Sequence, residues 1–255
     1  MMAKLDRKGV KIHYEVHGSG ATLLLSHGYS STCRMWDGQI AALRDRYQVV
    51  VWDMRGHGES DYPADQSLYS EELTVGDMKT LLDQVGAKTA IVAGLSLGGY
   101  MSLAFHATHP ERVRALMLFD TGPGFKKDEA RTKWNATAHK RAADLEARGL
   151  AALNTSDEVK LTRHRGADGL AHAARGMLAQ KNDRVIQSLD SIKVPTLVLV
   201  GANDTNFLAA TDYMAGKIKG STKAVIPDAG HAANLHQPAR FNQAVEAFLA
   251  KLPAA

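Results

Sequence analysis

Cysteine is nearly absent from this chain of 255 residues, in which Cys33 is the only example. A single thiol can form neither an intramolecular disulfide nor a cluster of thiolate metal ligands. The chain also lacks any apolar run near the ~18 residues that a transmembrane helix needs. Its first residues, MMAKLDRKGVKIHYEV, carry charge where a signal peptide has a continuous apolar core. We therefore expect a soluble protein of the reducing cytoplasm.

A basic cluster is missing as well. The 31 Lys and Arg residues exceed the 27 Asp and Glu residues by only four, and they are interleaved with acids rather than grouped with aromatic residues. This pattern gives little support for binding to nucleic acid or to membranes. Repeats, linkers and low-complexity tracts are absent too. An apolar content of 45% and a charged content of 23% are ordinary for one globular domain of this length.

The most informative segment is TAIVAGLSLGGY, at residues 89–100. Four apolar residues predict a buried strand, and the segment after Ser96 has the spacing of a helix until Pro110. A serine at such a sharp turn sits on a strained backbone, so Gly94 and Gly98 must be small enough for strand and helix to pass closely. The helix directs its free N-terminal amides at the serine, where they can stabilise an oxyanion. This geometry is suited to acyl transfer.

The rest of the chain alternates between strands and helices, which predicts a mostly parallel sheet flanked by helices. The expected strands cover residues 10–16, near the sheet edge, and 22–26, 48–52, 113–119, 195–201 and 222–226. The expected helices cover residues 35–46, 71–85, 207–219 and 234–252. Ser70 is predicted to cap the second of these helices.

Residues 122–192 break this alternation. The segment is rich in alanine, arginine and lysine, contains no buried-strand pattern and has helical stretches around 128–148 and 167–180. We predict a helical cap inserted into a core domain formed by residues 1–121 and 193–255. Such a cap excludes water and shapes the substrate pocket. The candidate pocket residues are Phe125, Trp134, Met177, Leu178 and Phe207.

Three strand exits carry the residues of a catalytic triad: Ser96, Asp204 and His231. The carboxyl ends of parallel strands share one edge of a sheet, so these residues can meet despite their separation in sequence. Asp120 also follows a strand and is an alternative acid. The exit after residue 26 places Tyr29 where its backbone amide can serve as an oxyanion donor, together with that of Leu97.

Other polar residues have simpler interpretations. His13 and His17 lie on one strand face, but no third metal ligand is placed by spacing, so we expect solvated side chains. The loop at residues 53–60 contains Asp, Arg, His and Glu, which we expect to satisfy its own backbone rather than to act in catalysis. We expect His236 inside the last helix, at the surface or at an interface, and His27 in support of the oxyanion loop, which follows the strand at residues 22–26.

Five motifs in order resemble the α/β-hydrolase fold superfamily: HGYSS at 27–31, DMRGHGES at 53–60, GLSLGG at 94–99, GANDT at 201–205 and DAGH at 228–231. Within it, the chain is similar to the small-capped bacterial group that contains 3-oxoadipate enol-lactonase and related esterases. The resemblance implies a serine hydrolase that cleaves small esters or lactones through an acyl-enzyme, as a monomer or homodimer, without a metal or an organic cofactor.

Several related chemistries stay open at this point. Carbon–carbon bond hydrolases of ring-cleavage products and cofactor-free haloperoxidases or perhydrolases resemble this chain in the same triad. A slow-turnover ligand-binding protein is a further alternative. Dehalogenases and epoxide hydrolases of the superfamily resemble it in their motifs but use an aspartate at the position of Ser96.

Overall fold

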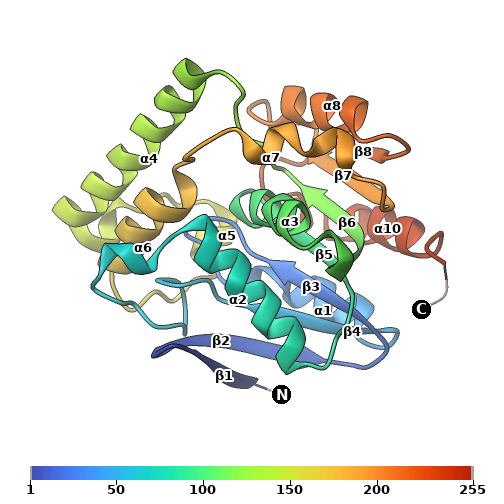
Figure 1. Cartoon of the computed structure of the whole chain (residues 1–255), viewed down its shortest axis with the longest axis horizontal. Helices are drawn as coiled ribbons and strands as arrows, with labels where there is room; N and C mark the ends of the chain where they lie inside the picture. The colour runs from blue at the N-terminus through green and yellow to red at the C-terminus, as the bar shows by residue number, and fades with distance from the viewer. Residues whose placement is uncertain (1, 254–255) are drawn as a thin grey trace.

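The computed structural model describes residues 2–253, which form one eight-stranded sheet between layers of helices (Figure 1). The strand order is β1-β2-β4-β3-β5-β6-β7-β8. From β4 to β8 the neighbouring strands are parallel, whereas β2 runs antiparallel to both of its neighbours, β1 and β4. The strands are β1 (Met2–Arg7), β2 (Val10–His17), β3 (Ala21–Ser26), β4 (Tyr47–Trp52), β5 (Ala90–Leu95), β6 (Val113–Phe119), β7 (Thr196–Gly201) and β8 (Thr222–Ile226). The predicted fold class is confirmed.

The central strands are buried on both faces. Every residue of β5 and β7 is buried, as their continuous Ala, Val, Ile and Leu runs predict for strands covered on both sides. The edge differs from the prediction. β1 pairs outside β2 with Met2 opposite Glu15, so the strand expected near the edge is the second one in. The mixed charged and apolar pattern of β1 had not indicated a strand.

Helices cover both faces of the sheet. On one face, α2 (Glu71–Gln84), α3 (Leu97–Thr108) and α8 (Leu208–Lys217) contribute to the larger apolar core. On the other, α1 (Asp37–Leu43), α9 (Ala233–His236) and α10 (Pro238–Leu249) enclose the second core with the short 3-10 helix η1 (Cys33–Trp36). The side chain of Ser70 caps α2 as predicted, accepting a hydrogen bond of 3.1 Å from Leu73 N.

Two helix predictions need correction. The segment expected as one helix over 234–252 is broken at Gln237, whose φ of −136° and ψ of 62° are not helical. The residue before a proline is disfavoured in the helical region, so Pro238 starts a new helix instead of continuing the old one. The first helix, expected over 35–46, is divided into η1 and α1 and ends at Leu43.

The segment between β6 and β7 is helical. It contains α4 (Asp128–Arg148), α5 (Asp157–Lys160), α6 (Asp168–Ala173), the π-helical turn η5 (Ala174–Leu178) and α7 (Arg184–Gln187). In Figure 1, α4 and α6 lie at the left of the sheet, and a small apolar cluster joins them through Leu145 and Leu170. The division of the chain into a core at 1–121 and 193–255 and a cap at 122–192 stays a prediction.

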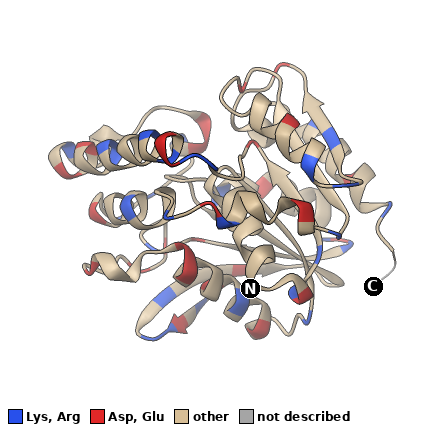
Figure 2. Ribbon diagram, turned by 45° about the horizontal axis from the view of Figure 1, so that its top comes forward, with Lys and Arg blue, Asp and Glu red and all other residues tan. Residues whose placement is uncertain are grey.

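The surface carries mixed charges. Figure 2 shows Lys and Arg interspersed with Asp and Glu, including along the long helix α4. Among residues 2–253, no helix has both the length and the apolar character required to cross a bilayer.

Candidate active site

Ser96 connects β5 to α3 in a conformation that few side chains adopt. Its φ is 54° and its ψ is −116°. A Cβ at Gly94 would lie 2.3 Å from the Gly98 backbone, and a Cβ at Gly98 would lie 2.1 Å from Ser26 O. Both glycines are therefore required by close approach, as the sequence predicts. Strain of this kind persists only where the surroundings hold it, and it is common at functional sites.

Two hydrogen bonds hold the serine in place. Ser96 N donates to Phe119 O of β6 at 3.0 Å, and the hydroxyl of Thr121 donates to Ser96 O at 2.6 Å. Both partners lie at the end of the neighbouring strand. The backbone of the strained turn is thus held by hydrogen bonds to the end of β6. Neither bond uses the hydroxyl of Ser96.

The structure brings His231 and Asp204 together. Nδ1 of His231 lies 2.7 Å from Oδ2 of Asp204, whose side chain is 3% exposed. A carboxylate accepts the proton on Nδ1, so this contact assigns the tautomer with a free lone pair on Nε2. The ring of Phe207 stacks on the imidazole with centroids 5.1 Å apart. Together these contacts fix the orientation of the ring and give Nε2 the character of a base.

Asp120 is a second buried carboxyl group close to this pair. It is fully buried at the end of β6, and its Oδ1 accepts a hydrogen bond of 2.7 Å from Gly201 N. Burial raises the pKa of Asp120 well above its usual range, and the charge of Asp204 adds to this effect against the opposing hydrogen bond from Gly201. The burial of Asp120 disfavours its charged form, and Asp204 is the acid whose side chain contacts His231.

The two residues proposed as oxyanion donors belong to segments that adjoin the serine turn. Leu97 is the first residue of α3, and the amides of a first helical turn have no partner inside the helix. Gly28 places the other loop against the turn, since a Cβ on it would lie 3.5 Å from the Cβ of Ser96. The hydroxyl of Tyr29 donates to Leu170 O of α6 at 2.9 Å, which ties this loop to the inserted helices.

The imidazole rings of three histidines pack together next to the oxyanion loop, the segment at residues 27–31 that follows β3. The ring centroids of His27 and His57 are 4.9 Å apart, and those of His57 and His164 are 5.8 Å apart. The Nε2 atoms of His27 and His57 accept from the backbone N–H groups of Met54 and Ser30, at 2.9 and 3.2 Å. Nδ1 of His27 donates to Gly28 O at 2.7 Å, so this side chain joins the loop after β3 to the loop after β4.

His164 comes from the inserted segment and completes the group. Its Nδ1 accepts from Gly58 N at 3.2 Å, and its Nε2 donates to Ser30 O at 3.1 Å. Accepting from a backbone N–H requires a neutral ring, so all three histidines must be unprotonated. Burial lowers the pKa of each, and that of His57 most clearly.

We predict that acid weakens the fold through these histidines. Each folded-state pKa is below the unfolded value of about 6.5, so the unfolded chain binds more protons below that pH and stability falls. The slope is at most about 1.4 kcal/mol per pH unit for each ring. The raised folded-state pKa of Asp120 acts on stability with the opposite sign. Thermal unfolding followed by circular dichroism at pH 7, 6 and 5 measures the sum.

The variant His164→Asn provides the comparison. It removes one titrating ring from the group and should flatten the dependence of melting temperature on pH between 5 and 7. The exposed His139 is the matched control, and His139→Ala should leave the slope unchanged. An unchanged melting temperature of the wild type across this range would contradict the assignment.

The predicted pocket residues lie in two places. Phe207 contacts His231, as described above. Trp134 of α4 donates from Nε1 to Leu178 O at 2.8 Å, and its ring lies 5.9 Å from that of Phe125. Met177 is 1% exposed and belongs to the larger apolar core. Four of the five therefore pack the inserted helices on one another and on the main domain, and their contact with substrate stays a prediction.

The polar loop after β4 satisfies its own backbone, as expected. Asp53 accepts from Cys33 N at 2.7 Å and from Glu59 N at 2.9 Å. Arg55 is buried and forms a two-pronged ion pair with Asp77 of α2, at 2.6 and 2.9 Å. A buried guanidinium needs such a partner, so this pair fastens the loop to the helix layer.

His236 has a contact that the sequence did not indicate. It is exposed, as expected, but it ends α9, and its Nδ1 accepts from Gly230 N at 2.9 Å. Its Nε2 lies 3.4 Å from Asp157 of α5. The loop that carries His231 is thus linked to the inserted helices. The sequence holds no signal for this contact or for that of His164, since both depend on how that segment folds back.

Comparison with known proteins agrees with this architecture. The sequence pattern of the alpha/beta hydrolase family matches residues 23–244. Over 245 residues the chain is 27% identical to a putative 2-succinyl-6-hydroxy-2,4-cyclohexadiene-1-carboxylate synthase of Bacillus subtilis, covering 89% of each chain. It is 27% identical to 3-oxoadipate enol-lactonase 1 of Acinetobacter baylyi, covering 96% of this chain and 95% of the relative.

A solved structure is similar over the full length. The thermophilic esterase from Thermogutta terrifontis superposes with a TM-score of 0.83 at 29% identity, covering 99% of both chains. The fold, the strained serine turn and the sequence match to most of the chain agree. The chain belongs to the alpha/beta hydrolase family.

Proposed function

We propose that this protein is a serine hydrolase that cleaves carboxylic esters or lactones of small molecules. The observation that carries the proposal is the hydrogen bond of 2.7 Å between His231 and the buried Asp204, at the same sheet edge as the strained Ser96. A base oriented by a carboxylate beside a serine on such a turn is the arrangement used for acyl transfer.

The proposed reaction has two steps. Nε2 of His231 takes the proton of the Ser96 hydroxyl as Oγ attacks the carbonyl carbon, and the same proton then passes to the departing alkoxide. Water, deprotonated by His231, attacks the acyl carbon and restores the serine. Asp204 stabilises the imidazolium in both steps. The amides of Leu97 and Tyr29 bind the oxyanion, and each lowers the activation barrier by about 3–4 kcal/mol.

The substrate class rests on the relatives. The esterase and the enol-lactonase cover nearly all of this chain at 27–29% identity, and both names describe cleavage of a carbonyl–oxygen bond. An ester and a lactone pass through the same tetrahedral intermediate. In a lactone the departing alkoxide stays attached to the acyl group, so the same residues serve both substrates.

A fluorophosphonate probe tests the nucleophile directly. The Ser96 oxygen should displace fluoride from phosphorus, with the proton passing to His231, and mass spectrometry should locate one phosphonate on the peptide that contains Ser96. The labelled protein should no longer hydrolyse p-nitrophenyl esters. Labelling at another serine with loss of activity would contradict the assignment.

His231→Gln provides the comparison for labelling. Glutamine keeps a polar side chain but cannot accept the serine proton, so the labelling rate should fall while the fold is kept. Equal rates in the variant and the wild type would show that His231 does not activate the serine.

A further inference from the structure

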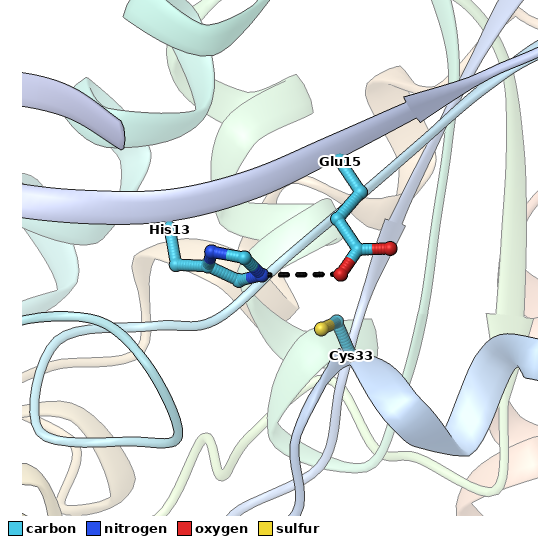
Figure 3. A group of neighbouring side chains, drawn as sticks. All are labelled: His13, Glu15 and Cys33. Atoms are coloured by element: carbon cyan, nitrogen blue, oxygen red, sulfur yellow. Dashed lines mark hydrogen bonds and ion pairs between the residues drawn. The ribbon is translucent and has the colours of Figure 1, made fainter. Parts of the chain in front are cut away.

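Side chains of the kinds that bind metals lie close together on β2, near the antiparallel edge of the sheet. Strand β2 presents His13 and Glu15 on one face, and η1 brings Cys33 over them (Figure 3). All three are buried, and one ligand atom from each lies within 4.8 Å of the others. His17 is on the same face of β2, and its Nε2 lies 2.9 Å from Oε2 of Glu15. The expectation of solvated histidines here is wrong for His13.

The carboxylate of Glu15 is the centre of this group. Its Oε1 lies 3.2 Å from Nε2 of His13, and Nη2 of Arg34 contacts both Oε1 and the sulfur of Cys33, the latter at 3.4 Å. Arg34 thus places a permanently charged guanidinium beside the carboxylate of Glu15, where a metal ion would also bind.

These donors match the preferences of zinc. Imidazole nitrogen, thiolate and carboxylate are its usual protein ligands, in a tetrahedral set of four. We propose that His13, Glu15, Cys33 and His17 bind a divalent cation of the zinc class at a structural site separate from the catalytic one. Zinc–ligand bonds of 2.0–2.3 Å imply ligand atoms about 3.5 Å apart, so the atoms of His13, Glu15 and Cys33, which lie within 4.8 Å of one another, would move together by about 1 Å when the metal enters. His17 contacts only Glu15 of this group, and its ring would turn toward the metal.

Arg34 competes with the metal and leaves as it binds. Its side chain is 37% exposed, and its Nη1 already lies 3.2 Å from the exposed Asp37. Zinc binding deprotonates the Cys33 thiol and releases one proton. The dication is then balanced by one thiolate and one carboxylate, while Arg34 pairs with Asp37. The metal enters past Arg34 and His17, which are the two partly exposed side chains of the group.

The bound metal would connect two parts of the fold. It would join β2 near the antiparallel edge to η1, which follows the oxyanion loop in the chain. Cys33 N also donates to Asp53 at 2.7 Å, so the same turn is held by the polar loop after β4. The proposal concerns stability and does not depend on the proposed catalytic function.

Cobalt titration of the full metal-free chain, kept reduced with a phosphine, tests the site. We expect one Co²⁺ per chain with a thiolate-to-cobalt charge-transfer band, and displacement of the cobalt by zinc. Free zinc at one hundred times its dissociation constant should raise the melting temperature by about 5–10 °C. Cys33→Ser should lose the band and most of the shift, whereas His139→Ala, which removes an exposed histidine, should keep both.

Arg34→Met is the sharper variant. It keeps the length of the side chain but removes the competing charge, so zinc should bind about tenfold more tightly than to the wild type, the factor of one charge-assisted hydrogen bond. X-ray absorption of the zinc-loaded wild type should show one sulfur bound to the metal and needs no variant. The proposal is overturned if neither protein gives a cobalt–thiolate band, or if the absorption spectrum shows only nitrogen and oxygen around zinc.

Discussion

Replacing Ser96 with alanine is expected to lower kcat for p-nitrophenyl ester hydrolysis about 10⁴- to 10⁶-fold, the largest effect that we predict for this chain. The substitution removes one oxygen, and with it the acyl-enzyme route. The backbone contacts of residue 96, to Phe119 O and from Thr121, do not involve that oxygen. The loss should therefore appear in kcat while the melting temperature stays near the wild-type value.

Ser102→Ala is the matched control. Ser102 is buried in α3, the helix that follows Ser96, and its hydroxyl donates to Gly98 O at 2.8 Å. It should retain wild-type turnover over a series of esters from short to long, and the optimum of that series reports the depth of the pocket. Full turnover by Ser96→Ala would remove the serine-hydrolase proposal, and the next assays would then use ring-cleavage products and peroxide.

The two buried aspartates should respond very differently to the same substitution. Asp204→Asn is expected to lower kcat about 10⁴-fold, because an amide favours the wrong tautomer of His231 and cannot stabilise the imidazolium. That factor corresponds to about 5.5 kcal/mol in the barrier. Asp120→Asn is expected to change kcat less than tenfold, since Asp204 and not Asp120 contacts His231 and the amide oxygen of asparagine can still accept from Gly201 N.

Both variants should be compared by their dependence of kcat on pH. Asp204→Asn should have low kcat at every pH, whereas Asp120→Asn should keep the wild-type profile even if the protein becomes less stable. A greater loss of activity in Asp120→Asn than in Asp204→Asn would move the acid of the triad to Asp120, the alternative that the sequence left open.

The core of the fold could be predicted because its signals are local. A continuous apolar run followed by a polar or glycine-rich exit indicates each buried parallel strand, and parallel strands bring their exits to one edge. That rule alone predicts that Ser96 meets Asp204 and His231, although Ser96 is more than a hundred residues from either; the structure shows the contact between Asp204 and His231. The strain at Ser96 followed from the two glycines, whose missing side chains the structure requires.

Long-range packing was not predictable in the same way. His164 contacts Ser30, which lies 134 residues earlier in the chain, only because the inserted segment folds back onto the oxyanion loop. The residues around position 164 have no sequence pattern that predicts this contact. Cys33 meets His13 for a similar reason, across two strands and a turn. β1 was missed because an edge strand has few buried positions to reveal its period, and only Leu5 is buried among its six residues.

The attachment of the oxyanion loop to the inserted helices limits how that region can change during evolution. Two bonds cross to it: the Tyr29 hydroxyl reaches a backbone carbonyl at Leu170, and Ser30 O receives the side chain of His164. The first makes no demand on residue type, but the second does. New substrate ranges could therefore arise by free substitution around α4, whereas an exchanged segment would need to retain an imidazole or an equivalent donor at position 164.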